Sequence, residues 1–170
     1  MIYMYLKLAD WASIAEIVLA VIAVLALIGA VAQVAVARSV SRETLTYNYT
    51  ERFATPEFLS FHQKTADLFA LEGASADGRY AVFQGWKYED QLAALLVPNL
   101  FEELAGMYNQ GLLHKGITKD FFGLTALDVW NRGSWFIERS RKSNPRYYEQ
   151  WELMLRDMDL PPAISVSTPT

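Results

Sequence analysis

The sequence contains no cysteine, and this absence excludes several kinds of site at once. Disulfide bonds, zinc–thiolate centres and thiol nucleophiles all need cysteine side chains. Histidine is scarce too, since His62 and His114 are the only two. A di-metal helical bundle needs a glutamate three residues before each histidine, but Leu59 and Gly111 occupy those positions. We therefore expect no metal site, no cofactor and no catalytic residue.

Strand patterns and nucleotide-binding motifs are also missing. No stretch alternates apolar and polar residues as a strand does, and no glycine-rich phosphate loop or nucleophile elbow is present. The formal charge of −4 is small and mixed in sign, which argues against nucleic-acid binding. The sequence predicts an all-α protein with no nucleic-acid partner, and it indicates no small-molecule ligand.

Charge is absent from one long stretch near the N-terminus. The range 17–37 holds 21 residues with one polar side chain, the amide of Gln33. A helix of this length rises about 30 Å, the thickness of a bilayer's hydrocarbon core. We expect a transmembrane helix over 17–37, preceded by an interfacial segment over 1–16.

A cleaved signal peptide is the alternative interpretation, because residues 35–37 (Ala-Val-Ala) have the form of a cleavage site. However, the apolar run is longer than that of a typical signal peptide. The segment before it is not basic, since it carries Asp10 and Glu16 against Lys7 alone. We favour an uncleaved anchor.

Orientation follows from the basic residues beside the apolar run. Lys7 precedes it, whereas Arg38, Arg42 and Arg52 follow it. Cytoplasmic segments carry the excess of lysine and arginine. The pattern predicts a single-pass protein of the inner membrane with its C-terminal domain in the cytoplasm.

The rest of the chain is divided by helix start signals. Residues 38–54 are expected to continue the apolar helix as a stem, and Thr55-Pro56 begins a helical domain over 55–159. This domain is predicted to be a bundle of about four to five helices. Residues 160–170 are expected to be a disordered tail with nothing to pack against.

Within the domain, one helix is predicted to start near Arg79 and to kink or break at Pro98. A helix over 126–141 is apolar on most sides, so we expect it to be the most buried. Asn144-Pro145 is a cap and proline pair that predicts the start of the last helix.

Four charged residues are candidates for a structural polar network. They are Glu89, Glu103, Arg132 and Arg139. At 100° per residue, Glu89 falls within an apolar helical face and Glu103 at the edge of the next one, whereas Glu102 points to the opposite side. A carboxylate paired with arginine at such an edge would fix the register of the helices.

The range 132–146 carries five basic residues and one acid, a net charge of +4. Its candidate basic patch consists of Arg139, Arg141, Lys142 and Arg146. A solvated helix end explains these cations, because positive charge is favourable at a helix C-terminus. Attraction to the anionic inner leaflet is the alternative.

Four alanines and one glutamine form a seam along the apolar run. They are Ala23, Ala26, Ala30, Gln33 and Ala37, which recur at 3-4-3-4 spacing. Small side chains let membrane helices approach closely, and Gln33 could donate a hydrogen bond across the interface. The seam is therefore a candidate for self-association, although alanine is common in spans that serve only as anchors.

The sequence resembles a bacterial family of membrane-anchored helical proteins that is catalogued as a domain of unknown function. The residues that carry the resemblance are Asn99-Leu100-Phe101-Glu102-Glu103-Leu104-Ala105, Tyr108, Gly111, Phe122-Gly123, Trp130, Arg139, Tyr147-Tyr148-Glu149, Trp151 and Leu153. It covers roughly 44–155, and Pro98 departs from the pattern. The resemblance implies an all-α fold and an N-terminal span, and it implies no activity.

These observations favour a membrane-anchored interaction or scaffold module without enzymatic activity. Its partners would be the lipid bilayer and either another protein or a second copy through the span. One alternative is a membrane-tethered enzyme that uses Glu89 or Glu103. Another is a domain that binds the membrane surface through the basic residues of 132–146.

Overall fold

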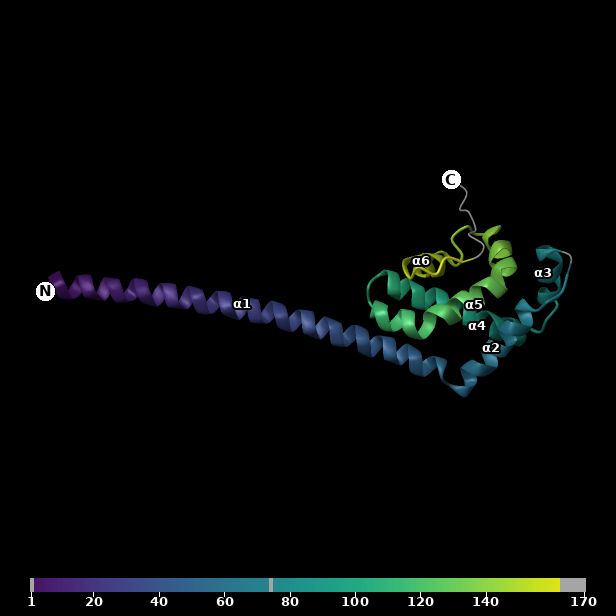
Figure 1. Ribbon diagram of the computed structural model, residues 1–170, viewed down its shortest axis with the longest axis horizontal. Helices are drawn as coiled ribbons and strands as arrows, with labels where there is room; N and C mark the ends of the chain where they lie inside the picture. Colours follow the sequence, from purple (N-terminus) through teal and green to yellow (C-terminus); the bar gives the residue numbers. More distant parts are fainter. Residues whose placement is uncertain (1, 74, 163–170) are drawn as a thin grey trace. The chain divides into compact units, whose positions relative to one another are not determined.

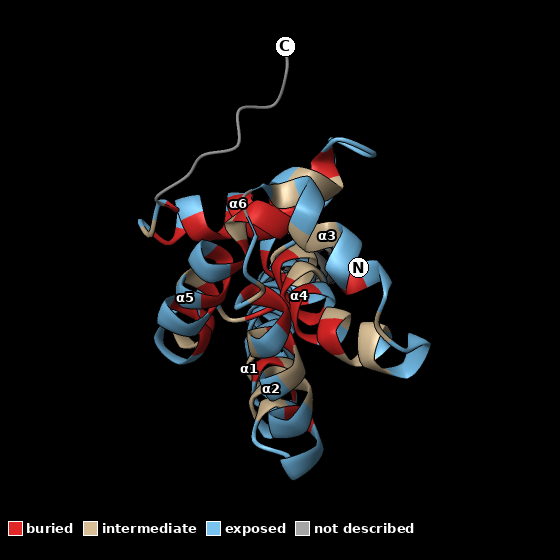
Figure 2. Ribbon diagram, turned by 90° about the vertical axis from the view of Figure 1, so that its right-hand side faces the viewer, coloured by how far each residue is buried: buried red, intermediate tan, exposed pale blue. Residues whose placement is uncertain are grey.

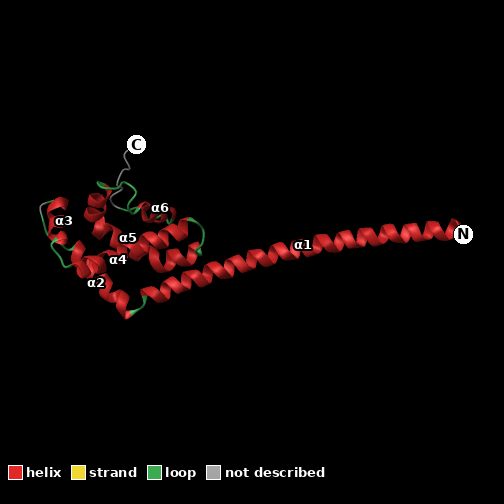
Figure 3. Cartoon of the chain, turned by 180° about the vertical axis from the view of Figure 1, so that it is seen from behind, coloured by secondary structure: helices red, strands yellow, loops and turns green. Residues whose placement is uncertain are grey.

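The computed structural model describes residues 2–73 and 75–162, which form six helices and no strand (Figures 1 and 3). The helices are α1 (Ile2–Phe53), α2 (Pro56–Phe69), α3 (Ala76–Gln84), α4 (Tyr88–Asn109), α5 (Lys115–Arg141) and α6 (Glu149–Asp157). The chain divides into two units, Met1–Ser41 and Arg42–Thr170. The predicted all-α fold, a long apolar helix followed by a helical bundle, is confirmed.

In the first unit, α1 carries apolar side chains all around its surface. From Ala15 to Ser41 every side chain is exposed, including Leu19 at 65% and Leu25 at 63%. By length and composition the helix over Ala15–Phe53 is able to cross a membrane, and a signal sequence near an N-terminus would have the same properties.

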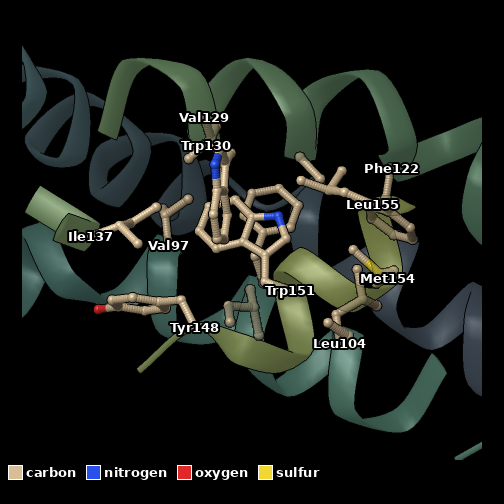
Figure 4. Packing of buried hydrophobic residues seen from close by; sticks show 14 of the residues in the cluster. Val97, Leu104, Phe122, Val129, Trp130, Ile137, Tyr148, Trp151, Met154 and Leu155 are labelled. Atoms are coloured by element: carbon tan, nitrogen blue, oxygen red, sulfur yellow. The ribbon is translucent and has the colours of Figure 1, made fainter. Parts of the chain in front are cut away.

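Three aromatic side chains from three helices meet at the centre of the second unit. Trp130 of α5 contacts Trp151 of α6 edge to face at a centroid distance of 5.2 Å, and Phe101 of α4 stacks on Trp151 at 5.0 Å. All three are fully buried, and Leu104 and Met154 lie around them (Figure 4). Figure 2 shows that the helices turn buried residues toward one another and exposed residues outward. Such aromatic contacts add about 0.5–1.5 kcal/mol each beyond the burial of area.

The C-terminal end of α1 belongs to this core. The hydroxyl of Thr46 is fully buried and accepts a hydrogen bond from the backbone N–H of His114 at 3.0 Å. Phe53 contacts the rings of three further phenylalanines, Phe58, Phe101 and Phe122. The compact unit therefore starts at Arg42, so that much of the predicted stem over 38–54 is a core helix of the domain.

A glycine divides two helices where the sequence predicted one. The helix α3 ends before Gly85, and α4 begins at Tyr88. Pro98, which was expected to kink or break its helix, lies inside the single helix α4.

A hydroxyl from α2 explains why α4 continues through Pro98. Proline has no N–H, so the carbonyl of Ala94, four residues earlier, loses its helical donor. The hydroxyl of Thr65 lies 2.8 Å from that carbonyl, and also 3.0 Å from the carbonyl of Phe61 in its own helix. Thr65 and Ala94 are both buried, and the hydrogen bond that the proline removes is replaced from α2.

Two helices start at residues that the sequence did not predict. The helix α5 begins at Lys115, well before the expected start, because the ring nitrogen Nδ1 of His114 accepts the N–H of Ile117 and caps it. The helix α6 begins at Glu149, because Asn144 forms a turn instead of a helix start.

The chain beyond α6 packs where no packing was expected. Leu160 lies against the core, so close to α5 that a Cβ at Gly123 would be 3.0 Å from its Cδ1. Pro162 is buried. The expectation of a free tail is therefore wrong at Leu160 and Pro162, and its remainder, 163–170, lies outside the described residues.

Candidate functional site

The predicted network between two glutamates and two arginines does not form. Its members are Glu89, Glu103, Arg132 and Arg139. Arg132 pairs instead with Asp128, one turn away on α5, at 3.0 Å. Arg139 pairs with Asp77 of α3 at 2.6 Å. Each arginine has a nearer acid than the glutamates of α4, and this proximity decides the pairing.

The two glutamates of that network occupy separate surfaces of α4. Glu89 is exposed, because the break at Gly85 resets the helical phase that had placed it in an apolar face. Glu103 accepts a hydrogen bond from the hydroxyl of Tyr49 at 2.6 Å. Fourteen helical residues separate these acids, a distance of about 21 Å along the axis. They therefore do not share a site, and an enzyme of the alternative interpretation would have to use one of them without the other.

Glu102 caps the start of α6. The sequence had predicted that this side chain points away from the apolar face of its own helix. Its carboxylate accepts the backbone N–H groups of Gln150 at 3.1 Å and Trp151 at 2.8 Å. The helix has no capping side chain of its own at Tyr148, so an acid from α4 supplies the cap. Burial raises the pKa of Glu102, and the two backbone hydrogen bonds oppose that shift. The only sequence signal was the missing cap residue before α6.

A buried ion pair joins α5 and α6. Arg141 contacts Glu152 at 2.8 Å, and the two side chains are 7% and 9% exposed. The guanidinium of Arg141 also donates to the carbonyls of Tyr147 and Tyr148, and Arg156 bonds the same glutamate. Sequence analysis missed this pair because both residues look like ordinary surface charges.

The basic patch predicted over residues 139–146 is wrong in its composition. Arg141 is buried in the ion pair and is not presented to a membrane surface. Arg139 and Lys142 both contact Asp77, and these contacts, that of Lys142 first, hold the pKa of this carboxyl below its usual value. Arg146 is exposed. Much of the net positive charge is thus neutralised within the fold.

An apolar groove of about 350 Å³ lies between the end of α1, α2 and α5. It is lined mainly by Thr50, Phe53, Phe58, Leu59, Phe121 and Phe122, and we refer to it as the α2–α5 groove. Leu59 is 63% exposed and Phe121 is 53% exposed. The ring of Tyr47 contacts that of Phe121 edge to face at 6.4 Å, which extends the apolar surface. Large apolar side chains gathered around a hollow typically mark an interaction surface.

A second, more polar cleft of about 240 Å³ lies beside it, between α2 and α4. Leu96 and Leu100 line it together with the carboxylate of Glu103 and the guanidinium of Arg52. Burial, followed by the hydrogen bond and charge of Glu103, raises the pKa of Tyr49 to about 12. Glu103, which accepts the hydrogen bond of the protonated Tyr49 phenol, therefore forms part of the wall of this cleft.

The two histidines have no shared role. His62 lines the α2–α5 groove, whereas His114 caps α5. Over the described residues, no group of three histidine, aspartate or glutamate side chains is arranged to hold a metal ion.

The predicted seam of small residues lies on a regular part of α1. Its members Ala23, Ala26, Ala30, Gln33 and Ala37 are helical and exposed. A shallow hollow of about 320 Å³ begins at Ala30 and follows the neighbouring face to Arg38. The seam is thus accessible, and self-association through it stays a prediction.

A family model matches most of the chain. Residues 20–158 match the family model described as a domain of unknown function, DUF4760. No curated protein and no solved structure matches the chain. The family match spans most of the apolar part of α1 as well as the domain, and it agrees with the resemblance found in the sequence. The chain belongs to the DUF4760 family.

Proposed function

We propose that this protein is a single-pass membrane protein whose C-terminal domain acts as a non-enzymatic interaction module in the cytoplasm. The exposed apolar side chains that α1 carries between Ala15 and Ser41 support a lipid environment. Arg38, Arg42 and Arg52 follow the apolar run, and this supports a cytoplasmic domain.

The observation that carries the interaction role is the α2–α5 groove. Its floor of phenylalanines is continuous with the core, and its rim exposes Leu59 and Phe121. Two neighbouring helices with an apolar channel between them are suited to an amphipathic helix laid into the channel. We therefore assign the groove to an apolar helix face of a partner protein.

Photo-crosslinking in cells tests this assignment on the full chain. A photoreactive residue replaces Phe121 in one variant and Leu153, an exposed leucine of α6 outside the groove, in the control. A discrete protein adduct is expected only from position 121, and Leu59→Glu should abolish it. Adducts of equal strength from both positions, or one that survives Leu59→Glu, would contradict the proposal. An adduct with the mass of two chains would identify the occupant as a second copy.

Topology is tested separately with reporters at the C-terminus. A fluorescent protein that matures in the cytoplasm should be active, and an alkaline phosphatase that needs the periplasm should be inactive. The reverse pattern would overturn the orientation. The mass of the membrane-bound protein distinguishes an uncleaved anchor from a signal peptide cut after residue 37.

A further inference from the structure

A cleft of about 280 Å³ opens between α3, α4, the end of α5 and the turn that follows it. Its polar lining includes Asn99 of α4 together with Tyr80, Arg139, Ser140, Ser143, Tyr147 and Tyr148. Phe136 provides an apolar wall, with its ring 6.3 Å from that of Tyr80. Polar groups that converge beside an apolar wall can fix the orientation of a small molecule. The volume equals that of about nine waters, room for a ligand of about ten heavy atoms.

Tyr148 enters this cleft from a strained backbone. Its φ of 60° lies in the left-handed region, which residues other than glycine seldom adopt. Arg141 holds the strained turn by donating to the carbonyls of Tyr147 at 2.9 Å and Tyr148 at 3.2 Å. A strained residue that its surroundings hold in place often belongs to a binding site.

The phenol of Tyr148 is a donor without a good acceptor. Its oxygen is 3.4 Å from Oδ1 of Asn99, which is long for a hydroxyl hydrogen bond. Burial, then the charge of Glu102, raises the pKa of Tyr148, so the phenol keeps its proton at neutral pH. A ligand oxygen in the cleft would give this proton a closer acceptor.

Two cations beside the cleft already converge on one anion. Arg139 lies 2.6 Å and Lys142 lies 3.1 Å from the carboxylate of Asp77. The guanidinium of Arg139 also lies over the ring of Tyr80 at 4.7 Å, which fixes its plane. The Asp77 carboxylate is 62% exposed, so a competing anion can reach the same donors from solvent.

We propose that this cleft binds a small organic molecule that carries a phosphate group. Arg139 donates to two phosphate oxygens in place of Asp77, because a planar guanidinium matches the spacing of those oxygens. The hydroxyls of Ser140 and Tyr147 complete the anion site, and the organic part lies against Phe136. Asp77 then acts as an internal competitor that occupies the cations when the ligand is absent.

If Asp77 competes with the ligand, two substitutions should change ligand affinity in opposite directions. Removing a cation should weaken binding, whereas removing the charge of Asp77 should strengthen it. A merely structural role for the Arg139–Asp77 pair would make both substitutions harmful or both neutral. Asp128 and Arg132 form a matched control, since they pair on α5 outside the cleft.

The test uses the full chain in phosphatidylcholine nanodiscs, titrated with phenyl phosphate by calorimetry. Saturable binding is expected, and Arg139→Gln should weaken it by about tenfold or more. Asp77→Asn should tighten it by about threefold or more, while Arg132→Gln and Asp128→Asn should leave it unchanged. Tyr147→Phe, which keeps the ring and removes an exposed hydroxyl, provides a milder variant that should weaken binding without unfolding. Thermal melts confirm that each variant is folded.

Two further arms identify the source of the phosphate. Inorganic phosphate should bind more weakly than phenyl phosphate if the apolar wall contributes. In nanodiscs that contain phosphatidic acid, an unchanged affinity for phenyl phosphate indicates a soluble ligand. A lower affinity indicates that the lipid headgroup competes for the site, provided that phosphatidic acid has no such effect on the Arg139→Gln variant. The absence of saturable binding, or equal effects of Arg139→Gln and Arg132→Gln, would overturn the proposal.

Discussion

Leucine side chains behave in opposite ways in the two units. Leu19 and Leu25 of the first unit are 65% and 63% exposed, whereas Leu68 and Leu104 of the second are fully buried. In the second unit, apolar surfaces cover one another and water drives their burial. In the first unit, the side chains from Ala15 to Ser41 have no such cover, and a bilayer would supply it. Leucine thus suits both the core of the domain and a surface that faces lipid.

The contrast extends to polar groups. A single helix pairs its own backbone N–H and C=O groups, so the first unit needs no tertiary hydrogen bond along its apolar part. The second unit buries Arg141, Glu152 and Thr65, and each of them has a partner there. Within the described part of the chain, buried polar groups are therefore paired across helices in the second unit alone, and substitutions at them should separate the two regions most strongly.

The largest effect is expected at the buried ion pair. Arg141→Met leaves Glu152 without its main partner and frees two carbonyls, so the free energy of unfolding should fall by about 3–5 kcal/mol. Chemical denaturation of the full chain in micelles measures this loss. Arg132→Met, which breaks an exposed pair on the same helix, should cost at most about 0.5 kcal/mol. The double variant Arg141→Met/Glu152→Leu should cost less than the sum of its single substitutions. Equal losses for Arg141→Met and Arg132→Met would refute the assignment.

A matched leucine pair tests the comparison directly. Leu104→Ala should lower the free energy of unfolding of the domain by about 2–5 kcal/mol, because it opens a cavity in the core. Leu25→Ala should leave the same quantity unchanged, because its side chain faces away from any protein contact within the described chain. A loss at Leu25 comparable to that at Leu104 would indicate protein packing around α1.

Removal of the Thr65 hydroxyl, which replaces the hydrogen bond that Pro98 cannot donate, should have an intermediate effect. Thr65→Val leaves the Ala94 carbonyl buried without its donor, at a cost of about 1–3 kcal/mol. In a Pro98→Ala background the helix regains its own N–H, so Thr65→Val should cost clearly less there. This double-mutant cycle is measured by denaturation. Equal costs in both backgrounds would mean that the hydroxyl does not serve this carbonyl.

The smallest effect concerns alkaline pH. The pKa of Tyr49 is raised from 10.0 to about 12, so the folded domain holds this proton more tightly than the unfolded chain. Its contribution to stability is complete below about pH 10 and is lost as the pH rises through 12. Tyr49→Phe should make the decline in stability between those values shallower. A decline of the same slope in Tyr49→Phe and in the unaltered chain would contradict this role of Tyr49.

The sequence was most informative where the signals are local. The uncharged run over 17–37 predicted a long apolar helix, and the pair Thr55-Pro56 marked the start of α2, where the Thr55 hydroxyl accepts the N–H of Phe58. Such signals depend on neighbours in the chain. The all-α architecture follows from them, because apolar periodicity and helix caps are local properties.

Partner choice could not be predicted in the same way. Glu103 was expected to meet an arginine and meets Tyr49, while Glu102 was expected to face away and instead caps α6. Both outcomes depend on which helices lie beside α4, and no local pattern contains that information. The helix does not break at Pro98 for a related reason, because the hydroxyl that replaces the lost hydrogen bond belongs to Thr65 of another helix.

The hydrogen bond from Thr65 to the Ala94 carbonyl also has an evolutionary consequence. A proline at position 98 costs the helix less while position 65 carries a hydroxyl at that distance. Without the proline, the Ala94 carbonyl would regain a helical donor, and the hydroxyl at position 65 would lose this role. A threonine that is already present therefore lowers the cost of acquiring the proline. For these two positions, 33 residues apart in the chain, we expect the order threonine first and proline second to be favoured.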